Sequence, residues 1–103
     1  MSLQNGRREG PRVIRRAIKR AMADIILIYR LTEQPLPPNR FRHEGIYTLT
    51  VTKISGGGKD REVCNLPDVT RSRREAEHIF DLISRGLVTP CTLEEIIEDF
   101  MAI

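Results

Sequence analysis

The chain has 103 residues, enough for one small domain, and its 40% hydrophobic and 30% charged residues are typical of a globular protein rather than a disordered one. Its longest apolar run, residues 25–28, is far shorter than the roughly 20 residues that span a bilayer, so no transmembrane segment is predicted. The absence of Trp and the scarcity of other aromatic residues disfavour a stacking surface for single-stranded nucleic acid.

The sequence indicates a cytoplasmic protein. Lys19, Arg20 and Asp24 interrupt any stretch that could serve as the apolar region of a secretory signal. Cys64 and Cys91 are too few, and too isolated from other ligand-type residues, to predict a disulfide framework or a zinc site. We expect both thiols to be reduced and partly buried.

Positive charge is concentrated at the start of the chain. In residues 1–20 seven basic residues stand against one acidic residue, so this segment carries +6 and the remaining residues carry −3 of a net charge of +3. The basic residues are Arg7, Arg8, Arg12, Arg15, Arg16, Lys19 and Arg20. Such an asymmetry is typical of a tail or helix with its own partner, or with its own electrostatic contact to the domain.

Residues 1–24 are predicted as a separate basic segment, a polar tail followed by an amphipathic helix that starts near Pro11. Apolar residues recur at the spacing of one helical face: Val13, Ile14, Ala17, Ile18, Ala21, Met22 and Ile25. Basic residues take the opposite face: Arg12, Arg15, Arg16, Lys19 and Arg20. A translation start at Met22 would omit residues 1–21, and the sequence leaves this alternative open.

Residues 25–103 are predicted as a small α+β domain. Residues 25–32 are rich in β-branched side chains and residues 46–54 alternate apolar with Thr, which indicates two strands separated by a Pro-rich loop. The turn-forming run of residues 55–60 then predicts a hairpin to a third, shorter strand at residues 61–66. Pro67 and Asp68 are expected to end the sheet.

Two amphipathic helices are predicted to follow. Ser72 with Glu75 forms a capping box, and Gly86 is the expected C-terminal stop. Thr92 with Glu95 forms a second box before the last helix. The apolar stripes are Ala76, Ile79, Phe80 and Ile83 in the first helix and Leu93, Ile96, Ile97 and Phe100 in the second. We therefore expect a three-stranded, mostly antiparallel sheet with both helices on one face, preceded by the N-terminal helix.

Three groups of residues resemble a small uncharacterised family of Firmicutes, domain of unknown function 6514. They are residues 29–33 (YRLTE), Tyr47 with Val51, and the final Thr89-Pro90, Leu93 and residues 96–100 (IIEDF). The resemblance covers roughly residues 28–101, and the basic segment, the Pro-rich loop and the triple Gly depart from the pattern. It implies the fold, but it implies no catalytic residues because the activity of that family is not established.

Candidate catalytic and metal sites are weak. Residues 56–59 lack the spacing of a phosphate-binding loop, because Asp60 and a strand follow Lys59. A nucleophilic pair of Cys64 or Cys91 with His43 or His78 has no local support. The carboxylates of Glu94, Glu95, Glu98 and Asp99 are read as a solvated helix face. We predict no catalytic residue, no cofactor and no metal.

The sequence predicts a non-enzymatic bacterial interaction or regulatory module that binds a protein partner or itself. The alternative is a nucleic-acid-binding protein that uses the basic helix, through Arg12, Arg15, Arg16, Lys19 and Arg20. An anionic membrane surface could attract the same helix. The helix could also be purely structural, with its apolar stripe packed and its basic residues solvated.

Overall fold

The computed structural model describes residues 10–36 and 45–101. Their elements, in chain order, are β2 (Arg12–Met22), β3 (Ile25–Pro35), β4 (Gly45–Ser55), the 3-10 turn η1 (Gly56–Gly58), β5 (Asp60–Thr70), α1 (Arg73–Arg85) and α2 (Pro90–Met101). Within the described residues, no helix has the length and apolar content needed to cross a bilayer.

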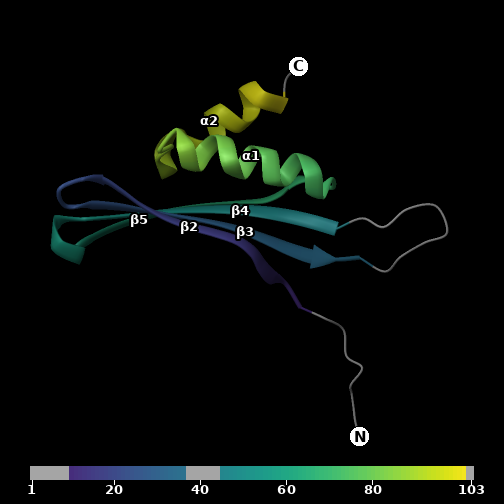
Figure 1. Cartoon of the computed structure of the whole chain (residues 1–103), viewed down its shortest axis with the longest axis horizontal. Coiled ribbons are helices and arrows are strands. Elements are labelled where there is room, and N and C mark those ends of the chain that lie inside the picture. The colour runs from purple at the N-terminus through teal and green to yellow at the C-terminus, as the bar shows by residue number, and fades with distance from the viewer. Residues whose placement is uncertain (1–9, 37–44, 102–103) are drawn as a thin grey trace, which may run out of the picture.

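The strands form one antiparallel sheet in the order β2-β3-β4-β5, so each strand pairs with its neighbour along the chain. Both helices lie over the same face of this sheet, with α1 closest to the strands (Figure 1). The predicted α+β class, the antiparallel pairing and the shared helix face are confirmed. The predicted number of strands is wrong, because the sheet has four rather than three.

The fourth strand is the segment predicted to be the basic amphipathic helix, and that prediction is wrong. Residues Arg12–Met22 form β2, which pairs with β3 along its whole length, from Arg12 opposite Glu33 to Met22 opposite Ile25. The boundary expected at residue 24 falls in the turn that joins these two paired strands.

Two irregularities in β2 explain the misleading pattern. The register shifts between Val13 and Arg15 and again between Arg20 and Met22. A β-bulge changes which residues face the core. The apolar residues that pack on the core are Ile14, Ala17 and Ala21, a spacing of three and four that imitates a helix. Strand pairing with β3 outweighs the modest helix preference of Ala, Arg, Lys and Met.

The predicted hairpin between β4 and β5 is confirmed, although β5 is longer than expected. Its turn contains Gly56, Gly57 and Gly58, all with positive φ, a conformation that glycine adopts without steric cost. Strand β5 continues through Pro67 to Thr70. Because β5 is an edge strand, the missing N–H of Pro67 removes no necessary hydrogen bond of the sheet interior.

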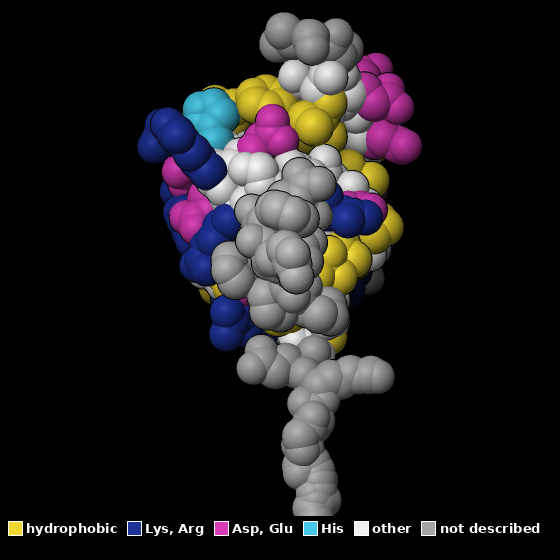
Figure 2. Space-filling view, turned by 90° about the vertical axis from the view of Figure 1, so that its right-hand side faces the viewer, with side chains coloured by type: hydrophobic (Ala, Val, Ile, Leu, Met, Phe, Trp, Pro, Cys, Tyr) yellow, Lys and Arg dark blue, Asp and Glu magenta, His cyan; other side chains and the backbone are white. Residues whose placement is uncertain are grey.

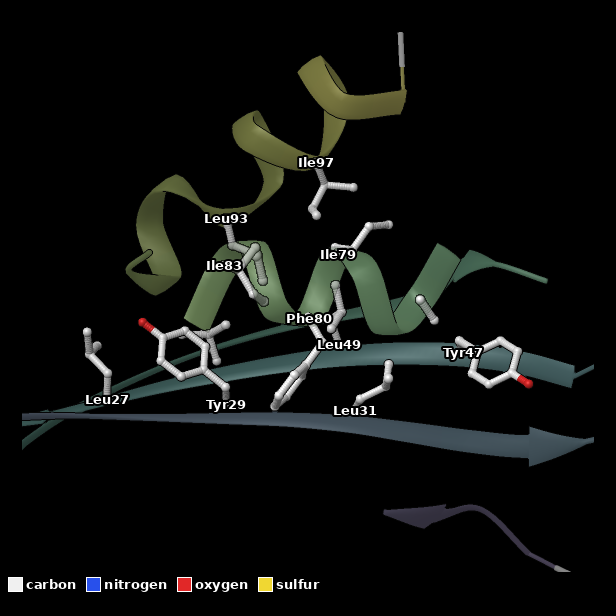
Figure 3. Packing of buried hydrophobic residues seen from close by; sticks show 12 residues of the cluster. Leu27, Tyr29, Leu31, Tyr47, Leu49, Ile79, Phe80, Ile83, Leu93 and Ile97 are labelled. Atoms are coloured by element: carbon white, nitrogen blue, oxygen red, sulfur yellow. The ribbon is translucent and has the colours of Figure 1, made fainter. Parts of the chain in front are cut away.

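The core lies between the sheet and α1, with α2 as a further layer. In Figure 3 the side chains of Leu27, Tyr29 and Leu31 point from β3 toward α1, and Phe80 points down between Tyr29 and Leu31. Leu93 and Ile97 of α2 point toward Ile83 and Ile79 of α1. All these residues are at most 7% exposed.

A buried hydroxyl connects the sheet to the segment between the helices. Tyr29 Oη donates a hydrogen bond to the carbonyl oxygen of Val88 at 2.8 Å. Burial raises the pKa of Tyr29 to about 12. The phenol therefore stays protonated and keeps this donor role across the physiological pH range.

Ser72 caps the first helix as predicted, but the Glu75 carboxylate accepts from the Thr70 hydroxyl instead of completing the box, and the second predicted box is wrong. The backbone N–H of Glu75 donates to Ser72 Oγ at 3.2 Å, and α1 ends at Arg85 with Gly86 as its C-cap. Helix α2 already begins at Pro90, so Thr92 lies inside its first turn. The Thr92 hydroxyl instead donates to the carbonyl oxygen of Thr89 at 3.3 Å.

Candidate functional site

The sheet face opposite the helices, here called the open face, is built from three rows of four residues, one residue from each strand. Residues directly opposite each other on neighbouring strands point to the same side of a sheet, so the register fixes each row. The rows are Arg16-Arg30-Thr50-Asn65, Ile18-Ile28-Thr52-Val63 and Arg20-Ile26-Ile54-Arg61.

Aliphatic side chains run through the middle of the open face. Ile18 and Val63, at the two ends of the central row, are 60% and 55% exposed; between them Ile28 is partly exposed and Thr52 is buried. Ile26 and Ile54 extend this apolar area into the next row. Several exposed aliphatic side chains on one face are a common mark of an interaction surface.

Four arginines frame the apolar residues, and the twelve residues of the three rows include no carboxylate. Arg16 and Arg30 lie directly opposite each other, an arrangement of like charges that destabilises a strand pair. Arg20 and Arg61 occupy the two ends of the third row. Within the described ranges, 10–36 and 45–101, the side chains of Arg16, Arg30 and Arg61 make no hydrogen bond or ion pair, and the Arg20 side chain donates to the Ala23 carbonyl oxygen at 3.2 Å.

The structure divides the five predicted binding residues between the two faces. Arg16 and Arg20 lie on the open face, while Arg15 and Lys19 lie opposite Leu31 and Leu27, on the side covered by the helices. Arg12 is tied to Glu33. The predicted set therefore does not form one basic surface.

Glu33 is the centre of a polar cluster at one end of the covered face. Glu33 is 8% exposed, and its carboxylate accepts hydrogen bonds from Tyr47 Oη at 2.7 Å and from Arg12 Nη2 at 2.9 Å. The Tyr47 hydrogen bond, and then Arg12, lowers the pKa of Glu33. Burial, with a contribution from Glu33, raises the pKa of Tyr47 to about 12.

Arg15 connects β2 to α1. Its Nη1 lies 3.1 Å from Glu77 Oε1 and its Nη2 lies 2.8 Å from Asp81 Oδ1, and its guanidinium carbon lies 4.7 Å from the centre of the Phe80 ring. Arg73 also holds Glu77, with Nε to Oε2 at 2.9 Å. On the covered face, then, a β2 arginine is neutralised by two carboxylates one helical turn apart.

Of the twelve open-face residues, only Arg16 and Arg20 were among the predicted binding residues. The residues that the sequence did not indicate include Arg30, Arg61, Val63 and the isoleucines beside them. A signal was present in residues 15–20, where reading every second residue separates Arg16, Ile18 and Arg20 from Arg15, Ala17 and Lys19. The cross-strand partners of these residues follow from register, which the sequence does not display.

The other candidate groups contribute little to a site. Ser72, Arg74, Glu75, His78 and Phe100 line a shallow groove of about 410 Å³, but the Ser72 and Glu75 side chains are engaged at the start of α1. Burial raises the pKa of the Cys64 thiol, which disfavours a nucleophilic thiolate. His43 lies outside the described residues. No group of three His, Cys, Asp or Glu side chains that could hold a metal ion is found in residues 10–36 and 45–101.

The acidic residues of α2 are exposed, as predicted. Figure 2, which views the molecule end-on, shows Asp and Glu side chains gathered beside the C-terminal end of the chain, apart from Lys and Arg side chains on the opposite flank. In this view acidic and basic side chains are only partly separated, because Asp or Glu side chains also lie among the Lys and Arg side chains of the left flank (Figure 2).

Comparison with known proteins gives one family. No curated protein and no solved structure matches the chain. A family of unknown function, DUF6514, matches residues 12–103, so the match begins with β2 rather than near residue 28, where the sequence resemblance was placed. Its span includes every strand of the sheet and both helices. The chain therefore belongs to the family of unknown function DUF6514.

Proposed function

We propose that the chain is a non-enzymatic cytoplasmic interaction module that binds a protein partner through the open face of its sheet. The observation that carries this proposal is the pair of arginines at positions 16 and 30, which face each other with no carboxylate among the twelve residues of the three rows. Such a pair costs stability in the isolated domain. A local conflict of this kind is typical of a functional surface that a ligand completes.

The apolar residues of the open face favour a protein partner. Ile18 and Val63 expose more than half of their side-chain surface, and burying them against a partner would be favourable. Aliphatic residues surrounded by arginine resemble the core and rim of protein interfaces, in which Arg is enriched.

Nucleic acid is less well supported by this surface. The helix on which that alternative depended is a strand, and Arg12 and Arg15 are already paired with carboxylates. The open face has no aromatic side chain on which a base could stack. Aliphatic residues also occupy the positions between the arginines, where phosphate contacts would need polar groups.

The proposal is tested by capture from a lysate of the organism that encodes the chain. Wild type is compared with an Ile18→Lys/Val63→Lys variant and with an Ile96→Lys control, which alters an exposed residue of α2. Nuclease treatment separates protein from nucleic-acid capture. We expect a nuclease-resistant protein that the control retains and the open-face variant loses. Capture that is equal in all three proteins would contradict the proposal.

A further inference from the structure

We infer that the partner element is an acidic amphipathic α-helix of another protein, laid across the strands of the open face. This inference rests on the proposed function and names the chemistry of its partner. The covered face of the same sheet is an internal example of the chemistry that binds such a helix, although α1 itself runs along the strands rather than across them (Figures 1 and 3).

On the covered face, α1 is itself an amphipathic helix whose Ala76, Ile79 and Phe80 are buried against the sheet. Its Glu77 and Asp81, four residues apart, bind the guanidinium of Arg15. One β2 arginine thus recognises two carboxylates on successive turns of a helix that also supplies an apolar stripe.

The open face also has arginine side chains beside aliphatic ones, but neither α1 nor α2 packs on it (Figure 1). Arg16, the next residue after Arg15, points to the opposite side and lies beside Arg30, while the central row of Ile18, Ile28 and Val63 runs parallel to the arginine row. The two rows are about 7 Å apart, two residues along a strand. This distance matches an apolar stripe and an adjacent acidic stripe on one helix surface.

The length of the face also suits a helix. Each row crosses four strands and is therefore about 14 Å long. This length corresponds to about three turns of α-helix. The exposed edges of a sheet bind extended segments, whereas its face binds helices and other sheets. Carboxylates on the partner would remove the conflict between Arg16 and Arg30 and would reach Arg20 and Arg61 at the far row.

A second copy of the chain fits the open face less well. Two open faces together would place eight arginines in one interface without a carboxylate. Helix α2 carries carboxylates, but Leu93 and Ile97 of its apolar stripe are buried in the core, which leaves Ile96 and Met101 as its exposed large apolar residues. We therefore place the acidic helix, with a full apolar stripe free to bind, on another protein.

The test uses a fluorescein-labelled helical peptide of about 18 residues, long enough to form a helix, with a leucine stripe flanked by glutamates four residues apart. A matched peptide has Gln in place of Glu, and a third has Lys. Binding is measured by fluorescence anisotropy at low and moderate salt. We expect the Glu peptide to bind and the Gln peptide to bind about tenfold more weakly.

Charge reversal on the protein provides the matched variant. An Arg16→Glu/Arg30→Glu protein should no longer bind the Glu peptide and should bind the Lys peptide. A Lys59→Glu/Arg85→Glu control, with the same net charge, should bind the peptides as wild type does. Circular dichroism checks that both remain folded. New binding of the Lys peptide would not result from misfolding of the variant.

Three results would overturn the inference: equal binding of the Glu and Gln peptides, stronger binding of an RNA or DNA oligonucleotide, or salt-sensitive self-association of wild type in sedimentation. If the Glu peptide fails while lysate capture still requires Ile18 and Val63, the partner chemistry is wrong and the proposed function stands. If lysate capture does not depend on Ile18 and Val63 either, both the inference about the partner and the proposed function are wrong.

Discussion

Arginine side chains have different neighbours on the two faces of the sheet. On the covered face, Arg12 and Arg15 bind carboxylates from β3 and α1, whereas Arg16 and Arg30 on the open face have each other as neighbours. Adjacent residues of one strand, Arg15 and Arg16, thus belong to different environments. The positive charges of β2 therefore have two roles. They stabilise the fold on the covered face and, we propose, bind a partner on the open face.

The largest expected effect is on the covered face. Phe80 is 1% exposed, so Phe80→Ala should lower the free energy of unfolding by about 3–5 kcal/mol through lost burial and a cavity. Ile18→Ala on the open face, at 60% exposure, should change it by about 0.5 kcal/mol or less. Urea denaturation measures both, and similar losses would remove the distinction between the faces.

The next largest effect is expected from Glu33, the buried carboxylate. Glu33→Gln removes the charge that holds Tyr47 and Arg12, and we expect a loss of about 1–3 kcal/mol at neutral pH. Because the folded-state pKa of Glu33 is lowered, its contribution is present above the unfolded value of about 4.3 and is lost as pH falls through the folded value. The variant should therefore lose less stability between neutral and acidic pH than wild type. Parallel pH curves would contradict this assignment.

Adjacent arginines provide a smaller, matched comparison. Arg15→Ala removes two ion pairs and a contact with the Phe80 ring, and should cost about 1 kcal/mol because the site is only partly shielded from water. Arg16→Ala should cost no stability and should slightly raise it, because it removes the like-charged contact with Arg30. Chemical denaturation of the two variants in one buffer checks the difference, and an equal cost would mean that Arg16 has a structural partner.

The smallest expected effect has the opposite sign. Arg16→Glu replaces a like-charged cross-strand pair with an oppositely charged one, which should raise stability by about 0.2–1 kcal/mol. The same substitution should weaken partner binding. A gain in the thermal midpoint together with a loss of capture would show that Arg16 is retained at the expense of stability, while destabilisation would contradict that view.

The sequence predicted the part of the fold in which each element shows its own periodicity. The Thr alternation of β4, the glycines of the β4–β5 turn and the Ser72 cap are local signals, and each corresponds to the structure. Strand β2 was misread because its bulges place Ile14, Ala17 and Ala21 at helical spacing. Its stability as a strand comes from β3, a tertiary contribution that no local pattern reveals.

The candidate site was harder to predict than the fold. Arg16 and Arg20 were identified because they belong to a dense basic run. Arg30 and Arg61 are isolated basic residues in other strands, and only the register of three strand pairs brings them onto the same face. The ion pairs of Arg12 and Arg15, which remove them from the surface, join residues 21 or more positions apart.

The most direct test of the central claim is site-specific photo-crosslinking in the native cell. A photoreactive amino acid is placed at position 18 on the open face or, as a control, at Leu82, an exposed residue of α1 with 44% exposure. The account predicts a discrete protein adduct from position 18 and none from position 82. Adducts from position 82 alone, or equally from both, would show that the open face is not the binding surface.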